Sequence, residues 1–204
     1  MVREVVRNRG LMQTFLPFAD FEMSARSLDT KRLGKQRVEC IQVVRGLVRP
    51  GYGWRHHPAV KMWRGHEEAL GRYGLTCCDV WLERGFVDTC AATIAADLAA
   101  AGVTRLRSQA DLAAAGALPP WLRDEDFHRG HRSSLLRKDP DSYRDRFPDV
   151  PDDLDYVWPG GRRPEGLAAA SGRVLPGTAS CTGALADAGM TADQSIRQPP
   201  RMPK

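Results

Sequence analysis

The clearest pattern in the sequence is a helical one that follows Asp29. Apolar side chains recur there at steps of seven, eight, eleven, fourteen and fifteen from the first, which places them on one helical face: Leu33, Cys40, Ile41, Val44, Leu47 and Val48. Asp29 or Ser27 is suited to cap the start, and Arg49-Pro50-Gly51 breaks the end. The pattern predicts a helix that runs to about Val48.

Further helices are predicted downstream, over residues 57–70, 75–84, 88–102 and 127–138. Pro58 suits a first helical position, where a missing N–H costs nothing. Gly85 is a natural left-handed C-cap, and Asp88 can cap the alanine-rich helix that follows. Strand signals are weak and short, so the predicted fold class is all-α.

Composition divides the chain into three parts. Residues 1–11 read as an extension or as the result of a start codon assigned too early, because Met12 begins a natural start and a first buried strand-like segment. From Gly160 onward, small and polar residues dominate, and so few large apolar residues cannot offset chain entropy. We expect a single compact helical domain over 12–159, followed by a disordered tail over 160–204.

Charge and cysteine content narrow the class of protein. The 204 residues are 42% hydrophobic and 27% charged, with a net charge of +5, which permits nucleic-acid binding without requiring it. The most apolar run, 89–103, is too short to span a bilayer, and the N-terminus lacks the apolar block of a secretory signal. The 5 cysteines show no repeated C-x-x-C spacing. We therefore expect reduced thiols in a cytoplasmic protein, with no metal and no other cofactor.

One carboxylate on the predicted helix stands among bases. A helical wheel puts Glu39 opposite the apolar face, close to Arg32, Lys35 and Gln36, so we expect it on an exposed basic surface. One interpretation is an ordinary Lys35–Glu39 pair on a solvated face. The other is a phosphate-binding surface that keeps a repulsive carboxylate because chemistry requires it.

The loop 51–58 forms a second candidate cluster. Tyr52 and Trp54 offer stacking faces, while Arg55, His56 and His57 offer phosphate contacts. The alternative is a tight interhelix loop whose aromatic side chains plug the core. Metal binding by the adjacent histidines is disfavoured, because neighbouring residues rarely converge on one ion.

A third cluster covers residues 127–140. His128 and His131 are one helical turn apart, with basic neighbours at Arg129, Arg132, Arg137 and Lys138. The histidine pair could hold a metal or contact phosphates, and a bare surface helix explains it equally well. Taken alone, none of the three clusters identifies a function.

Four segments, in order, resemble the pyrimidine-dimer DNA glycosylases related to phage endonuclease V. They are Leu28-Asp29-x-Lys31-x-Leu33 followed by Glu39, the glycine-rich loop before His57-Pro58, Arg84-Gly85-Phe86 at a helix end, and His131 followed by Lys138-Asp139-Pro140 and Tyr143. The resemblance covers about Met12 to Tyr143 with comparable spacing. It extends to a bacterial branch of the family that carries Lys-Arg-Leu-Gly-Lys-Gln-Arg-Val-Glu and Gly-Tyr-Gly-Trp-Arg-His-His-Pro.

The resemblance implies a DNA glycosylase with abasic-site lyase activity. In that family an amine attacks the anomeric carbon of the damaged nucleotide, a Schiff base forms as the glycosidic bond breaks, and β-elimination cuts the strand. By position, the resemblance implies that Glu39 is the catalytic carboxylate and His57 the loop histidine, and that Arg32 and Arg37 contact DNA. A lone carboxylate among bases is expected to stay ionised and to stabilise an oxocarbenium-like centre.

Departures from the family pattern leave the attacking amine open. In the phage enzyme it is the α-amine of a small N-terminal residue exposed after methionine removal, whereas here Gln13 follows Met12. The amine is then that of Met12, or Lys31 or Lys35 replaces it, or lyase activity is lost. Val38 also stands where the family carries an arginine, so specificity for dimers is implied by the family more than by the residues.

Expected partners follow from the same resemblance. We expect a monomer that binds damaged double-stranded DNA in the cytoplasm, associated with the nucleoid and not with a membrane. The predicted DNA-binding residues are Lys31, Arg32, Lys35, Arg37, Trp54, Arg55, His56, His131 and Arg132. Two rival hypotheses remain: a non-catalytic nucleic-acid-binding module, and an enzyme on a small nucleoside-type substrate. The second places Glu39 and His57 in a closed pocket lined by Trp54 and Trp63.

Overall fold

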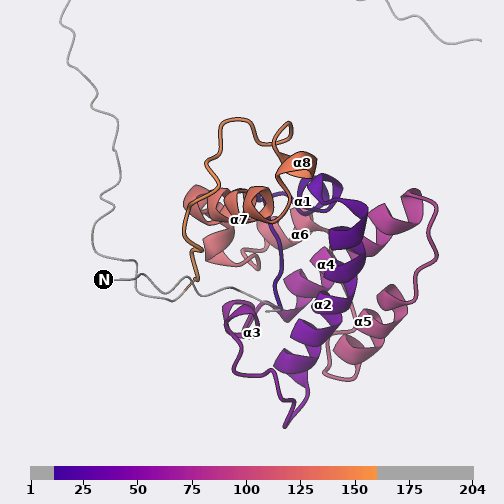
Figure 1. The fold of residues 1–204 in the computed structure, drawn as a ribbon. Coiled ribbons are helices and arrows are strands. Elements are labelled where there is room, and N and C mark those ends of the chain that lie inside the picture. The colour runs from indigo at the N-terminus through magenta and orange to yellow at the C-terminus, as the bar shows by residue number, and fades with distance from the viewer. Residues whose placement is uncertain (1–11, 160–204) are drawn as a thin grey trace, which may run out of the picture. The chain divides into compact units, whose positions relative to one another are not determined.

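The computed structural model describes residues 12–159, which form eight α-helices and one 3₁₀ helix with no strand among them (Figure 1). In chain order they are α1 (Phe21–Ser27), α2 (Thr30–Val48), α3 (Pro58–Met62), α4 (Glu67–Glu83), α5 (Cys90–Ala99), α6 (Gln109–Ala114), η1 (Pro120–Arg123), α7 (Glu125–Lys138) and α8 (Pro140–Tyr143). The predicted all-α class is confirmed. The predicted extension over 1–11 and tail over 160–204 lie outside the described residues. No helix within 12–159 is both long and apolar enough to cross a bilayer.

The longest helix, α2, begins and ends as predicted. The side chain of Asp29 caps it by accepting a hydrogen bond of 2.9 Å from the backbone N–H of Arg32. Its predicted apolar face is buried at Leu33, Cys40 and Val44, and it packs against α4 and α5. The 3.6-residue periodicity therefore identified the correct core face of this helix.

The single helix predicted over 57–70 is in fact two helices. His57 caps α3 through its Nδ1 atom, which accepts from the backbone N–H of Ala59 at 3.2 Å, and Pro58 occupies the first turn as predicted. The chain then turns at Gly65, whose φ is +80°, and α4 begins only at Glu67. The prediction was wrong because buried side chains on both sides of a short turn continue the apolar periodicity. For the same reason α4 includes the helix predicted separately over 75–84.

The remaining predicted boundaries are close to the observed ones. Gly85 has a φ of +84° and ends the fourth helix, as expected of a left-handed C-cap. Asp88 accepts a hydrogen bond of 2.8 Å from the backbone N–H of Ala91 in the first turn of α5. The short elements α1, α6, η1 and α8 were not predicted, because four to seven residues are too few for a clear apolar period.

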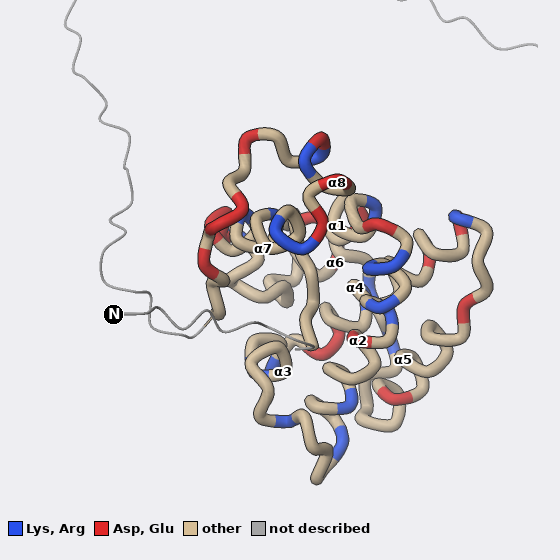
Figure 2. Tube along the Cα trace, viewed as in Figure 1, with Lys and Arg blue, Asp and Glu red and all other residues tan. Residues whose placement is uncertain are grey.

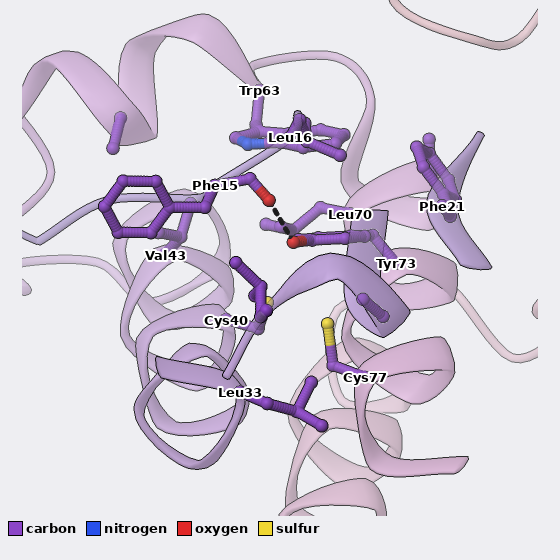
Figure 3. Packing of buried hydrophobic residues seen from close by; sticks show 14 of the residues in the cluster. Phe15, Leu16, Phe21, Leu33, Cys40, Val43, Trp63, Leu70, Tyr73 and Cys77 are labelled. Carbon is purple, nitrogen blue, oxygen red and sulfur yellow. Dashed lines mark hydrogen bonds between the residues drawn. The ribbon is translucent and has the colours of Figure 1, made fainter. Parts of the chain in front are cut away.

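The core lies between α2 and α4 (Figure 3). Trp63 and Tyr73 are fully buried there, and their rings are stacked with centroids 6.4 Å apart. At Gly74, a Cβ atom would lie only 3.1 Å from the Cβ of Cys40, so glycine permits the close approach of α4 to α2. The four described cysteines are free and buried, and Cys181 lies outside the described residues.

Residues 12–16 form a buried segment without helical turns that runs between α2 and α7 (Figure 1). Because no strand lies beside it, side chains satisfy its backbone. The amide of Gln36 accepts from Phe15 N at 2.8 Å and donates to Gln13 O at 3.0 Å, and His131 Nδ1 accepts from Leu16 N at 3.0 Å. The prediction of a buried segment is confirmed, but the segment is not a strand.

Candidate active site

Glu39 is buried beneath this N-terminal segment. Its residue exposure is 4%, whereas the wheel placed it on an exposed surface. The prediction was wrong because residues 12–16 cover a second face of α2, the one that carries Gln36 and Glu39. Glu39 Oε1 accepts a hydrogen bond from the backbone N–H of Gln13 at 3.3 Å and lies 3.3 Å from Lys35 Nζ.

Burial changes the electrostatics of this carboxyl. Desolvation raises the pKa of Glu39, and the opposing effects of Lys35, the Gln13 N–H and Lys138 do not cancel it. The surrounding bases oppose this shift but do not reverse it, so the pKa of Glu39 is raised and not lowered. A carboxyl with a raised pKa is better suited to exchange protons near neutral pH.

Two lysines are arranged around Glu39. The Lys35 side chain is 62% exposed, so its amine contacts the buried carboxylate and solvent at once. Lys138 ends α7, and its pKa is lowered, first by burial and then by the charges of Arg137, Arg32 and Lys35. Figure 2 shows basic positions along α2 and at the end of α7 next to α8. The sequence named Lys138 only as part of a motif, because nothing linear connects it to Glu39.

Tyr156 is a further neighbour of this site that the sequence analysis missed. Its hydroxyl lies 3.1 Å from His131 Nδ1, and its pKa is raised by burial and by the charge of Glu39. The carbonyl of Asp155 would lie 3.0 Å from a Cβ atom at Gly130, so this part of the chain packs directly on α7. An aromatic pair, Tyr156 and Trp158, just before the polar tail was the only sequence signal for it.

The two histidines of α7 are internal and not on a surface helix. His128 and His131 are each 1% exposed. The ring nitrogens of His128 lie 2.8 Å from Leu16 O and 2.9 Å from Leu122 O. His131 Nδ1 accepts from Leu16 N–H, which leaves the proton on Nε2, and burial lowers its pKa well below the usual value. Both histidines thus hold the N-terminal segment in place, and the surface interpretation was wrong for them.

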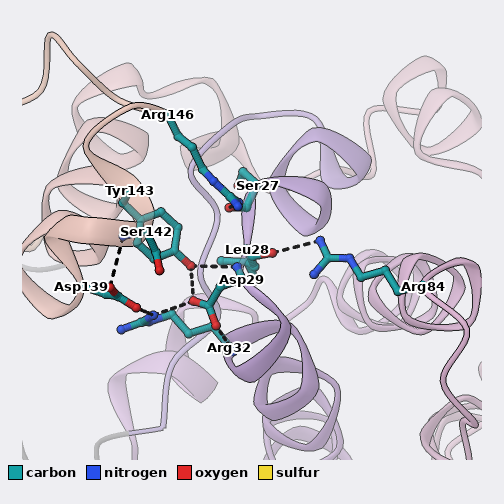
Figure 4. A network of polar contacts seen from close by, with 9 residues as sticks. All are labelled: Ser27, Leu28, Asp29, Arg32, Arg84, Asp139, Ser142, Tyr143 and Arg146. Atoms are coloured by element: carbon teal, nitrogen blue, oxygen red, sulfur yellow. Dashed lines mark hydrogen bonds and ion pairs between the residues drawn. The ribbon is translucent and has the colours of Figure 1, made fainter.

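Arg32 belongs to a polar network that joins the start of α2 to α8 (Figure 4). Its guanidinium lies 2.5 Å from Asp29 Oδ2 and 2.9 Å from Asp139 Oδ2. The hydroxyl of Tyr143 donates to Asp29 at 2.6 Å and accepts from the Asp29 N–H at 3.0 Å. These contacts explain the Lys-Asp-Pro…Tyr pattern structurally, since they fix the end of α7 against α2.

The other basic residues of α2 and α7 that were predicted to contact DNA differ in their exposure to solvent. Arg37 is 8% exposed, pairs with Asp88 and lies over the ring of Trp81, with its central carbon 4.0 Å from the centroid. Arg132 donates to the Pro17 carbonyl at 2.6 Å and pairs with Glu125. Lys31 and Lys35 are exposed. The structure therefore gives Arg32, Arg37 and Arg132 partners within the protein, while the two lysines face solvent.

The loop before α3 presents aromatic and basic groups at the surface. Trp54 is 44% exposed, and Arg55 and His56 are exposed beside it, so the interpretation that Trp54 plugs the core was wrong. His57 lies behind them, with ring centroids 5.5 Å from Trp54 and 6.5 Å from Trp158. Burial lowers the pKa of His57. Its Nε2 atom is buried without a hydrogen-bond partner among residues 12–159.

A closed pocket around Glu39, His57, Trp54 and Trp63 is not supported. Trp63 is fully buried in the core, where its Nε1 donates to Thr14 Oγ1 at 2.9 Å. Two surface hollows lie beside His66, one against Gly102–Arg105 and one against Gln109 and Arg123, away from Glu39. Within 12–159, no group of three or more histidine, cysteine or acidic side chains has the arrangement of a metal site.

The N-terminal part of the described residues is similar to a known family. Residues 12–94 match the family model described as pyrimidine dimer DNA glycosylase. No curated protein and no solved structure matches the chain. The match confirms the resemblance over these residues and includes Glu39, Lys35 and His57, whereas Lys138 and Tyr156 lie beyond it.

Proposed function

Residues 12–94 match the family of pyrimidine dimer DNA glycosylases, and on this premise we propose that the chain breaks the glycosidic bond of damaged pyrimidines in DNA through an amine and the carboxyl of Glu39. We further propose that it then cuts the strand as an abasic-site lyase. The matched family is one of DNA glycosylases, so DNA is the substrate that the match implies. The Schiff-base route, the lyase step and the roles of individual residues are parts of the proposal.

The observation that carries the proposal is the burial of Glu39 beside an exposed amine. Burying a carboxyl costs free energy unless its partners compensate, and the raised pKa of Glu39 shows that they do not compensate fully. A carboxylate near a DNA-binding surface also repels phosphates. A group that is unfavourable for both folding and DNA binding is best explained by chemistry.

Glu39 has two tasks in this scheme. As a carboxylate it accepts the proton that an attacking amine must lose, because only a neutral amine has a free electron pair. As a carboxylic acid it returns a proton to the leaving base or to the ring oxygen of the sugar. Its raised pKa suits both tasks, since the two protonation states then lie closer in free energy near neutral pH.

DNA binding is assigned to the exposed cations and the aromatic loop. Lys31 and Lys35 on α2 and the loop residues Trp54, Arg55 and His56 face solvent, as phosphate contacts and base stacking require. His57 lies behind this surface and caps α3 through Nδ1, while its Nε2 is buried without a hydrogen-bond partner among residues 12–159. Arg32, Arg37 and Arg132 instead act by positioning the elements that carry these groups.

The proposal is tested with Glu39→Gln, which removes the carboxyl but keeps the shape of the side chain. Strand cleavage of a duplex with one pyrimidine dimer should fall by about 100- to 10,000-fold, the usual range for a lost general acid–base. Affinity for the duplex should stay the same or increase. Glu22→Gln is the matched control, because Glu22 is exposed on α1 in a surface pair with Arg26, and it should leave cleavage unchanged.

A non-catalytic binding module predicts a different result. It would bind duplex DNA with the salt dependence of phosphate contacts but break no glycosidic bond in dimer-containing DNA. Unchanged cleavage by Glu39→Gln would remove Glu39 from the mechanism. A wild-type chain that breaks no glycosidic bond at the dimer would remove the glycosylase proposal itself.

A further inference from the structure

We propose that Lys35 Nζ is the amine that attacks the sugar and forms the Schiff base. This inference rests on the proposed glycosylase function. It answers the question that the sequence left open among Met12, Lys31 and Lys35. The choice follows from which amine reaches both Glu39 and the solvent from which DNA approaches.

Lys35 meets both conditions. The two residues are one helical turn apart on α2, with Lys35 Nζ 3.3 Å from Glu39 Oε1. The Lys35 side chain is 62% exposed and that of Glu39 is 5% exposed, so the amine bridges a buried base and the open surface. Among the ion pairs of residues 12–159, Glu39 is paired with Lys35 alone.

The α-amine of Met12 is the rival nucleophile. In the printed sequence the nitrogen of Met12 is an amide joined to Leu11, which has no basic electron pair. A chain that begins at Met12 would carry a free amine there, one residue from the Gln13 N–H that contacts Glu39 at 3.3 Å. The same carboxylate thus serves either amine, but only the lysine is a nucleophile whichever residue begins the chain.

The neighbouring lysines fit supporting tasks. Lys31 is exposed on the preceding turn of α2, and no ion pair joins it to a carboxylate within 12–159. Lys138 is close enough for its charge to act on Glu39, and the charge of Lys35 in turn helps to lower the pKa of Lys138. Positive charge gathered at this point attracts phosphate.

The ammonium of Lys35 gives a proton to the Glu39 carboxylate, and the neutral Nζ attacks C1′ while the C1′–N glycosidic bond breaks. The departing base leaves with the glycosidic electron pair and takes the proton from Glu39. Glu39 then moves a second proton from Nζ to the ring oxygen O4′, the C1′–O4′ bond opens, and a protonated Schiff base remains. Loss of a C2′ proton to Glu39 expels the 3′ phosphate, and water releases the sugar from Lys35.

The test is to trap the Schiff base with borohydride and locate it. The full 204-residue chain is mixed with a duplex that contains one abasic site, reduced, digested and mapped by mass spectrometry. The lysines to be distinguished are Lys31, Lys35, Lys61, Lys138 and Lys204, together with the N-terminal amine. We expect the reduced sugar on Lys35, and we expect Lys35→Arg to lower trapping by on the order of 100-fold or more.

Controls separate this inference from the proposed function. Lys35→Arg keeps the positive charge at an exposed site, and circular dichroism checks that it folds. Lys61→Arg, on α3, is the matched control and should trap as the wild type does. An adduct on the N-terminal amine or on another lysine would overturn the assignment to Lys35 and leave the lyase proposal standing. Glu39-dependent cleavage of the glycosidic bond without any adduct would also overturn it. A wild-type chain that neither breaks the glycosidic bond nor traps would overturn both.

Discussion

Two carboxylates are buried beside α2, and their environments have opposite effects. The side chain of Asp88 is 3% exposed and that of Glu39 is 5% exposed, and each contacts a basic residue of α2. Burial by itself raises the pKa of both. For Asp88, the N–H of Ala91 and the guanidinium of Arg37 outweigh burial, and the pKa is lowered. For Glu39 the partners do not, and the pKa is raised.

The difference lies in the partners and not in the depth of burial. Arg37 is itself buried under Trp81, so its planar guanidinium is held against Asp88, and the first turn of α5 adds backbone N–H groups. Lys35 is exposed, and water screens its contact with Glu39. A buried pair with fixed geometry stabilises the ionised acid, while a solvated partner stabilises the ionised form of a buried acid less. The first arrangement is typical of structural sites and the second of functional ones.

The largest effect on stability is expected when the carboxylate of Asp88 is removed. Asp88→Ala leaves the buried guanidinium of Arg37 without a counter-charge, so the free energy of unfolding should fall by about 3–5 kcal/mol. Urea unfolding measures this change. Asp79→Ala, at an exposed position of α4, is the matched control and should stay within about 0.5 kcal/mol of wild type. A loss at Asp88 no greater than at Asp79 would contradict the structural role.

A smaller effect on stability is expected when the hydroxyl of Tyr143 or of Tyr156 is removed, and it should differ between the two. The Tyr143 hydroxyl donates to the charged Asp29, so Tyr143→Phe should cost about 1.5–3 kcal/mol. The Tyr156 hydroxyl lies against the neutral ring of His131, so Tyr156→Phe should cost about 0.5–1.5 kcal/mol. Thermal or urea unfolding of both variants tests the order. The reverse order would mean that Tyr156 has a stronger partner than the imidazole.

The smallest effect is in the pH dependence of stability, and it should have opposite signs for the two acids. The pKa of Glu39 is raised by folding, so its contribution is complete below its ordinary value of 4.5 and is lost as the pH rises through the folded value. The pKa of Asp88 is lowered, so its contribution is present above its ordinary value of 3.8 and is lost as the pH falls through the folded value.

The opposite pH dependence of the two acids can be measured by urea unfolding of variants at the two positions over a pH series. Glu39→Gln should gain stability relative to wild type as the pH rises through the raised pKa, because the variant has no buried charge to form. Asp88→Asn should lose relative to wild type as the pH rises through the lowered pKa. The opposite result would be that the wild type becomes more stable relative to Glu39→Gln as the pH rises. The partners of Glu39 would then lower its pKa, and the contrast between the two acids would fail.

The fold was predictable where a local rule acts on neighbouring residues. The Asp29 cap, the buried face of α2 and the end of α4 at Gly85 follow from capping chemistry and helical period. The turn at Gly65 was not predictable in this way, because the apolar positions on both sides of it belong to one core. A period in the sequence cannot distinguish one helix from two that pack around the same centre.

The site was predictable in its residue types and not in its exposure. Glu39 and Lys35 were singled out as neighbours on one helix, and their contact follows from the spacing of four. The burial of Glu39 depends on residues 12–16, which lie more than 20 positions earlier in the chain and are held there by Gln36 and His131. Tyr156 and Lys138 join the site only because α7 and the segment after it return to α2.

The sequence by itself therefore determined the extent of α2, its core face and the pairing of Lys35 with Glu39, all of which depend on contacts within a few residues. Only the tertiary structure decided which charges are buried and with what partners. The difference in burial separates the two pairs that α2 carries: Arg37 is buried with Asp88, whereas Lys35 is exposed beside Glu39. The physical reason is that desolvation depends on what covers a side chain, and the covering segments come from distant parts of the chain.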